Sequence, residues 1–293
     1  MKGEMLFKKS YVDYNEFGVQ TLYNARVYNY LKNTSQISDS YITATDISSF
    51  VYCPASYSIK KTFNDLPQYN EEAELGTEMH EQNRLAMYVP EEREEGSFTK
   101  LITTPEFYTE QNKRFFDDIR SSSIYYIGHS ENPVRYFKSS KGKFVGQPDY
   151  IFRNKLGENF VVEEKFKYFK NKVNKAYSNH KAQIISYLSG LDTIDAQYGY
   201  LVYWYYDYTN DIRYIRECVT HKFQNNALGQ EYVREIYKKI SILNSGNSLF
   251  FDPTQLDANK CASCVMRIFC GHKTGRFSEV SAPYDKSYYE LSK

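Results

Sequence analysis

The chain has 293 residues, of which 41% are hydrophobic and 25% charged, a composition typical of a folded globular protein and not of a disordered one. The formal net charge of +1 gives no global preference for nucleic acid, so any DNA-binding surface must be local. No apolar run is long enough for a transmembrane helix, and the N-terminus lacks the apolar core of a signal peptide. We therefore expect a cytoplasmic protein with no membrane partner, in a reducing compartment where clustered cysteines bind metal more often than they form disulfides.

The predicted elements begin after an N-terminal extension of residues 1–40. A short helix is expected to start at an N-cap formed by Thr45 and Asp46. At Pro54 the chain is expected to turn or to begin a new helix, because proline suits the first helical turn but not a helix interior. A longer helix is predicted over residues 69–89, with apolar side chains along one side and acidic ones on the other.

Strands dominate the middle of the chain. A helix over about residues 105–120 is followed, between residues 132 and 169, by three β-rich runs separated by the turn sequences SSKGK and NKLGEN, which predicts an antiparallel meander. A basic helix over about 173–191, two strands within 197–220 and a helix over 229–243 complete the series. This order predicts a single α/β or α+β core with additions at both ends.

The best candidates for catalysis lie on two adjacent β-rich runs. Asp149 belongs to the first run, and Glu163 and Lys165 belong to the second. Side chains alternate along a strand, so Glu163 and Lys165 share one face while Glu164 points to the other. Two carboxylates on neighbouring strands can hold Mg²⁺ or Mn²⁺, and a lysine beside them can position or deprotonate water and stabilise charge on a phosphate. The alternative is a solvated hairpin with a cross-strand Glu–Lys pair.

Three further side chains fit such a site. His80, in the predicted helix upstream, can supply a third metal ligand, which would favour Mn²⁺ over Mg²⁺. A lone histidine is also often only structural. Gln183 and Tyr187 are four residues apart and therefore lie on one face of the helix that follows the second run, as any amphipathic helix allows.

A run of lysines follows Glu163. These side chains can form a local phosphate-binding surface beside the site. For the members beyond Lys167, a solvated loop is an equally good interpretation. The DNA-binding candidates are Lys167, Lys170, Lys172 and Lys175.

The cysteines are concentrated near the C-terminal end of the chain. Cys261, Cys264 and Cys270 lie within ten residues, while Cys53 precedes the candidate catalytic segment. Four thiolates satisfy either structural zinc or a 4Fe–4S cluster, and the residues alone leave both open. A redox pair is less favoured, since no thioredoxin-like unit precedes the motif. Cys218, within an apolar strand, is expected to be a buried core residue.

Taken in order, these motifs resemble the RecB-like branch of the PD-(D/E)xK nucleases. The cysteines that flank them resemble the iron–sulfur members of that branch, which include the CRISPR-associated exonuclease of spacer acquisition and the AddB-type repair nucleases. The resemblance covers roughly residues 41–273. The residues that carry it are Gly76 with His80, Asp149 in GQPD, Glu163 with Lys165 in EEK, and Gln183 with Tyr187 in QIISY.

The resemblance implies a restriction-endonuclease-like core, a central mixed sheet flanked by helices, with an iron–sulfur subdomain formed by both chain ends. The nuclease domain would span residues 41–273, followed by a C-terminal tail, 274–293. The resemblance also implies that Cys53 and the three C-terminal cysteines hold the cluster, and it is the resemblance that favours iron–sulfur over zinc.

The implied activity is that of a Mg²⁺- or Mn²⁺-dependent DNA exonuclease acting on single-stranded ends or overhangs. His80, Asp149 and Glu163 would bind the metal ion, and Lys165 would orient the attacking water. Gln183 and Tyr187 would position the lysine or the DNA. Integrase subunits in CRISPR adaptation or helicase subunits in repair and recombination are the expected partners. The alternative is a DNA-end-binding adaptor of a larger complex with little intrinsic cleavage.

Overall fold

The computed structural model describes residues 41–62, 76, 78–81, 107–128, 136–140, 142–210 and 212–244. The chain divides into two compact units, and the candidate catalytic residues all belong to the unit that contains Tyr41–Ser48 and Gln68–Glu235, here called the core unit. The predicted N-terminal extension and C-terminal tail lie outside the described residues. None of the helices in the described segments is both long and apolar enough to cross a membrane.

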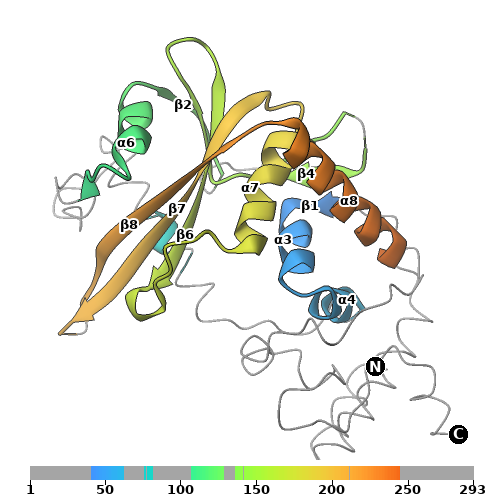
Figure 1. Ribbon diagram of the computed structural model, residues 1–293, viewed down its shortest axis with the longest axis horizontal. Coiled ribbons are helices and arrows are strands. Elements are labelled where there is room, and N and C mark those ends of the chain that lie inside the picture. Colours follow the sequence, from blue (N-terminus) through green and yellow to red (C-terminus); the bar gives the residue numbers. More distant parts are fainter. Residues whose placement is uncertain are drawn as a thin grey trace, which may run out of the picture. The chain divides into compact units, whose positions relative to one another are not determined.

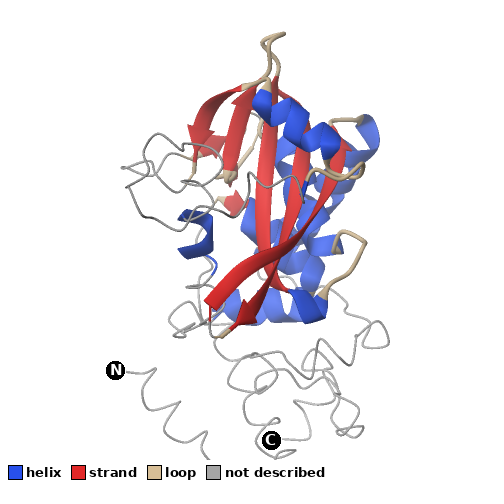
Figure 2. Cartoon of the chain, turned by 90° about the vertical axis from the view of Figure 1, so that its left-hand side faces the viewer, coloured by secondary structure: helices blue, strands red, loops and turns tan. Residues whose placement is uncertain are grey.

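A five-stranded mixed sheet forms the centre of the core unit. The strand order is β2-β5-β6-β7-β8; β6 and β7 run parallel, and the other neighbours are antiparallel. Figure 2 shows its long, twisted strands in red. The sheet confirms the expected mixed α/β architecture. The strands are β2 (Ser123–Ile127), β5 (Tyr150–Arg153), β6 (Asn159–Tyr168), β7 (Ala196–Thr209) and β8 (Ile212–Gln224).

The predicted NKLGEN turn joins β5 to β6. Asn154 Oδ1 accepts hydrogen bonds from the backbone N–H groups of Leu156 and Glu158, at 2.9 and 3.0 Å. Gly157 has a φ of +81°, a conformation that glycine adopts without the steric cost borne by other residues. Local turn chemistry therefore sets the register of the hairpin, in which Tyr150 lies opposite Val162.

Helices cover both faces of the sheet (Figure 1). On one face, α6 (Lys113–Arg120) contributes Phe115 and Phe116 to the main hydrophobic core. On the other face lies α7 (Ser178–Gly190), the crossover helix between the parallel strands β6 and β7. Its Ile184 packs so closely on β7 that a Cβ added at Gly199 would lie 3.1 Å from Ile184 Cδ1.

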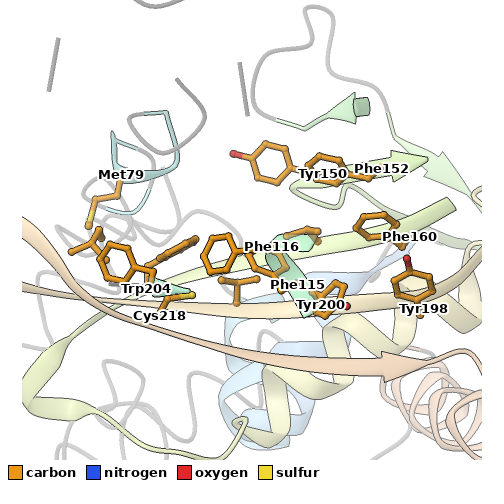
Figure 3. Packing of buried hydrophobic residues seen from close by; sticks show 14 residues of the cluster. Met79, Phe115, Phe116, Tyr150, Phe152, Phe160, Tyr198, Tyr200, Trp204 and Cys218 are labelled. Carbon is orange, nitrogen blue, oxygen red and sulfur yellow. The ribbon is translucent and has the colours of Figure 1, made fainter. Parts of the chain in front are cut away.

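Aromatic rings from the strands and from α6 form the main core. Phe160 stacks between Phe152 and Tyr198, with ring centroids 5.3 and 4.9 Å away. Burial of such rings is the main favourable contribution to folding. Figure 3 shows this cluster, whose labelled members are Met79, Phe115, Phe116, Tyr150, Phe152, Phe160, Tyr198, Tyr200, Trp204 and Cys218.

The predicted meander is wrong in one respect. Both predicted hairpins form, β3 (Phe137–Lys138) with β4 (Phe144–Gly146) and β5 with β6, but the middle run is divided between two sheets: β4 also pairs with β1 (Ile42–Thr43), in a separate three-stranded sheet ordered β1-β4-β3. The segment between β4 and β5 thus connects two sheets. That position matters for the site, because the segment contains Asp149.

Several helix boundaries also differ from expectation. The helix α3 (Ala44–Tyr52) is capped by Thr43 instead of Thr45: Thr43 Oγ1 accepts from the N–H of Asp46, and Asp46 Oδ2 accepts from the N–H of Thr43, both at 3.0 Å. A new helix does begin at Pro54, as one alternative predicted. Both α6 and α7 start later than expected, and β2 had no prediction. Two further helices in the described segments are α4 (Pro54–Thr62) and α8 (Ala227–Asn244), and residues 76 and 78–81, within the helix predicted over 69–89, are also helical.

Candidate active site

Asp149 lies where β5 stops pairing with β6. The described β5–β6 ladder ends with Tyr150 opposite Val162, so β6 continues beyond its β5 partner. Beyond this point the carboxylate of Asp149 replaces a backbone carbonyl as the hydrogen-bond acceptor: its Oδ2 accepts from the N–H of Glu164 at 2.7 Å. The acid is thereby fixed to the backbone of β6, in the position where a further strand residue would have bonded.

The segment around Asp149 is also held from the β2 side. The N–H of Gly128 donates to the carbonyl of Asp149 at 2.8 Å, and Gln147 Nε2 donates to the carbonyl of Gly128 at 2.6 Å. A Cβ at Gly128 would lie only 2.5 Å from the carbonyl oxygen of Pro148, so the close approach requires glycine.

Gln183 and Tyr187 hold the same segment from the α7 side. Gln183 Nε2 donates to the Tyr187 hydroxyl at 3.1 Å, which in turn donates to the carbonyl of Gln147 at 3.1 Å. Burial, followed by the charges of Glu163 and Asp149, raises the pKa of Tyr187 well above its ordinary value, so the hydroxyl keeps its proton. Tyr187 thus contacts the segment that contains Asp149, and Gln183 supports this contact through the Tyr187 hydroxyl.

Glu163, which is buried, and Lys165, which is half-buried, form a pair on the face of β6 that α7 covers. Lys165 Nζ lies 2.6 Å from Glu163 Oε1, as strand alternation predicts. Burial and then the charge of Asp149 raise the pKa of Glu163 to about 7, although Lys165 opposes the shift. The second oxygen, Oε2, is buried and accepts no hydrogen bond from any described residue.

Lys165 carries a positive charge in this arrangement. Burial alone would lower the pKa of its amine, but the carboxylates of Glu163 and Asp149 outweigh that effect and raise the pKa above its ordinary value. Of the three roles that the sequence suggested for Lys165, a charged amine suits the orientation of water and the stabilisation of charge, and does not suit proton abstraction.

Glu164 points to the opposite face of β6, where the main core lies. It is fully buried, and its Oε1 accepts a hydrogen bond of 2.8 Å from Trp204 Nε1. Its Oε2 lies 3.5 Å from Nδ1 of His80, whose other nitrogen, Nε2, lies 4.0 Å from Asp149 Oδ2. Burial lowers the pKa of His80, but Asp149 and Glu164 together outweigh it, and the net shift is upward.

Sequence reasoning did not find Glu164 and Trp204 as parts of the site. The structure brings His80 to Asp149, and places its second ring nitrogen beside Glu164 instead of Glu163. The doubled acid in EEK was the available signal for Glu164. No signal connected Trp204, which is 40 residues further along the chain.

The chemistry of these donors suits a hard divalent cation. Carboxylates and an imidazole are the ligands expected for Mg²⁺ or Mn²⁺, and a cation would offset both the burial and the repulsion by Asp149 that raise the pKa of Glu163. The buried, unsatisfied Oε2 of Glu163 is a further acceptor that a cation could use. Within the described segments, no three His, Cys, Asp or Glu side chains are already gathered as a metal-binding group.

The predicted DNA-binding lysines lie at the end of β6 and in the segment after it, where three of them contact aromatic rings. Lys167 Nζ lies 5.9 Å from the centre of the Tyr177 ring, and Lys170 Nζ lies 5.4 Å from that of Tyr168. Lys172 is 5.9 Å from the Phe169 ring and also pairs with Glu217, at 2.6 Å. Lys175 is exposed.

Only one of the four predicted cluster ligands belongs to the described residues. Cys53 is half-buried between α3 and α4, and its Sγ lies 3.5 Å from the N–H of Ser56. Cys261, Cys264 and Cys270 lie outside the described residues, so the cluster stays a prediction. Cys218 is buried in β8, which confirms its expected place in the core.

Comparisons with known proteins give structural likenesses at low sequence identity. No family model matches the chain, and no curated protein matches it. A crystal structure of a protein named SSO0001 is similar with a TM-score of 0.43 and 18% identity, over 86% of this chain and 96% of the other. An alkaline exonuclease, LHK-Exo, from Laribacter hongkongensis has a TM-score of 0.40 and 11% identity, over 69% and 85%. Its complex with dAMP has a TM-score of 0.37 and 11% identity, over 69% and 91%.

Proposed function

We propose that this chain is a Mg²⁺- or Mn²⁺-dependent deoxyribonuclease that hydrolyses phosphodiester bonds at single-stranded ends or overhangs. The observation that carries the proposal is the arrangement of Asp149, Glu163 and Lys165. Asp149 lies where β5 stops pairing with β6, its charge acts on the buried carboxyl of Glu163, and a half-buried, charged lysine lies 2.6 Å from Glu163. An ordinary solvated hairpin pair would be exposed, whereas Glu163 is only 2% exposed.

The proposed division of roles follows from the contacts. Asp149, Glu163 and His80 would hold the cation, which when bound supplies Lewis-acid activation of water and phosphate. Lys165 would orient the attacking water and stabilise the negative charge that develops on the phosphate. Gln183 and Tyr187 would keep the segment of Asp149 in place through the carbonyl of Gln147.

The decisive experiment compares the wild-type protein with Lys165→Ala on end-labelled single- and double-stranded DNA, with Mg²⁺, Mn²⁺ or EDTA. Shortening that needs metal and falls at least about 100-fold in the variant would support the proposal, a loss typical for removal of a group that stabilises developing charge. Circular dichroism of both proteins controls for folding. Cleavage by the variant at the wild-type rate would remove Lys165 from the mechanism. If neither protein cuts but both bind DNA ends, the adaptor function is the better description.

We further propose that Cys53, Cys261, Cys264 and Cys270 hold a structural 4Fe–4S cluster. Protein purified without oxygen should be brown, and Cys261→Ser should lose the colour and much of the soluble yield. Colourless wild-type protein with stoichiometric zinc would establish the alternative metal. CRISPR adaptation with an integrase partner and DNA repair with a helicase partner both suit the proposed activity, and neighbouring genes would distinguish them.

A further inference from the structure

Glu164 makes contacts to three other parts of the candidate site. Its backbone N–H donates to Asp149 Oδ2 at 2.7 Å, and its Oε1 accepts from Trp204 Nε1 at 2.8 Å. Its Oε2 lies 3.5 Å from His80 Nδ1. One residue thus contacts both the acid and the imidazole that face each other across 4.0 Å.

The position of this carboxylate is costly for a purely structural residue. Glu164 is 0% exposed, and its face of the sheet carries Val162, Val202 and Trp204 in the main core. Removing an ionisable group from water costs several kcal/mol, and a well-packed apolar residue of similar volume is often as stable or more so. A carboxylate in this core therefore calls for a role that an apolar side chain would not perform.

The two nitrogens of an imidazole have different roles when one of them binds a metal ion. A metal-binding histidine almost always donates its other N–H to a carboxylate, a carbonyl or water, which fixes the tautomer and the ring orientation. Here Nδ1 faces the Glu164 carboxylate and Nε2 faces Asp149. A proton on Nδ1 leaves the lone pair of Nε2 directed toward the side of the proposed cation.

We propose that Glu164 is a positioning residue that orients His80 for the cation, and that Trp204 fixes the Glu164 carboxylate. This inference rests on the metal-dependent function proposed above, and assigns to the second acid of EEK a role distinct from that of Glu163. Other contacts restrict the imidazole in the same way: its ring meets Phe166 edge-on at 4.9 Å, and the preceding Met79 is buried in the same cluster as Trp204 (Figure 3).

The test measures Mn²⁺ affinity by calorimetry, on wild-type protein, Glu164→Gln, His80→Ala and the double variant. Glutamine keeps the size of Glu164 and can still accept from Trp204, but it lacks the charge that holds a proton on His80 Nδ1. We expect Glu164→Gln to weaken Mn²⁺ binding by about 10- to 100-fold, as loss of such an outer partner typically does. In the His80→Ala background the same change should have almost no further effect. Cleavage at saturating Mn²⁺ should recover toward the wild-type rate in Glu164→Gln.

Trp204 gives a readout that does not depend on cleavage, because it is the only tryptophan of the chain. Selectively excited tryptophan fluorescence should be quenched by Mn²⁺ in the wild-type protein, with a midpoint equal to the calorimetric affinity. In Glu164→Gln this midpoint should move to higher Mn²⁺ by the same factor. Tyr205→Phe, at the residue next to Trp204, is the matched control. It removes two hydrogen bonds of the Tyr205 hydroxyl, one donated to the carbonyl of Val173 at 3.0 Å and one accepted from the N–H of Val173 at 3.3 Å, and should leave Mn²⁺ affinity unchanged.

Each contrary result has a separate meaning. Equal Mn²⁺ affinity of Glu164→Gln and wild-type protein would overturn the positioning role while leaving the proposed nuclease intact. An undiminished effect of Glu164→Gln in the His80→Ala background would mean that Glu164 acts at the metal ion itself, and would also overturn the positioning role. Failure of the wild-type protein to bind Mn²⁺ or to cut DNA would overturn the proposed function together with this inference.

Discussion

Lys165 Nζ lies 2.6 Å from Glu163 Oε1, and the two side chains are 23% and 2% exposed on the same face of β6. This short contact joins a cation to a carboxylate that is itself forced close to a second acid, Asp149. Even so, the pKa of Glu163 is raised to about 7, because burial and Asp149 together outweigh the lysine. The carboxyl of Glu163 therefore retains its proton mainly because it is buried, with a further contribution from Asp149.

The first prediction concerns the pH dependence of stability in EDTA. The pKa of Glu163 is about 7 in the folded protein and ordinarily 4.5, so the folded state retains a proton that the unfolded state has released. This contribution to the free energy of unfolding is complete below pH ~4.5 and is lost as the pH rises through about 7, by on the order of 1–3 kcal/mol. Glu163→Gln should lack this loss. Urea unfolding at pH 5 and pH 8 measures it, and equal pH dependence of the two proteins would contradict the assignment.

The second prediction has the opposite sign and concerns His180. Burial first, and then the charges of Lys165 and Lys167, lower the pKa of His180 to about 2, and its Nδ1 lies 3.0 Å from the Tyr203 hydroxyl. The unfolded state takes up a proton below the ordinary pKa of 6.5, but the folded state does not. Stability should fall by up to ~1.4 kcal/mol per pH unit of acidification. His180→Gln should reduce this slope between pH 6 and pH 4.5; an unchanged slope would show that the folded histidine is protonated.

The third prediction concerns replacement of Gly128, whose close approach to Pro148 holds the segment that contains Asp149 in place. In Gly128→Ala the new Cβ would lie 2.5 Å from the carbonyl oxygen of Pro148, so the segment must shift. We expect a loss of about 1–3 kcal/mol in stability and a clear loss of Mn²⁺ affinity. Gly157→Ala is the control: its added Cβ meets nothing within 4 Å, but the φ of +81° makes it strained. It should cost roughly 1 kcal/mol and leave Mn²⁺ affinity unchanged. Equal Mn²⁺ affinities for Gly128→Ala and Gly157→Ala would show that Gly128 does not affect the position of Asp149.

The fourth prediction compares two lysines after β6. Lys170 is exposed, whereas Lys172 pairs with Glu217 at 2.6 Å. Lys170→Ala should weaken single-stranded DNA binding and reduce the slope of log affinity against log salt by about 0.7, the value for one phosphate contact. Lys172→Ala should change both less, because Glu217 already offsets its charge. Titrations by fluorescence anisotropy at several salt concentrations measure the slopes, and a larger effect for Lys172 would reverse their assignment.

The parts of the fold that could be predicted are those that local sequence determines. The turn between β5 and β6 follows from Asn154 and Gly157, and strand alternation then places Glu163 and Lys165 on one face. The antiparallel pairing of β3 with β4 could also be predicted, from the turn sequence between them, but the parallel pairing of β4 with β1 could not, because β1 lies about 100 residues earlier in the chain. The same holds for Trp204, whose position beside Glu164 follows from the register of two parallel strands, with Phe166 opposite Trp204.

The end of β5 at Tyr150 also has a consequence for hydrogen exchange. On β6, the central strand of the five, the N–H of Glu164 donates to the carboxylate of Asp149, and Glu163 and Glu164 are 2% and 0% exposed. Exchange of this amide with solvent deuterium should therefore require unfolding of the sheet, and not a local opening. The protection of the Glu164 amide from exchange can therefore be used to test whether the site is folded in protein that contains neither metal nor DNA.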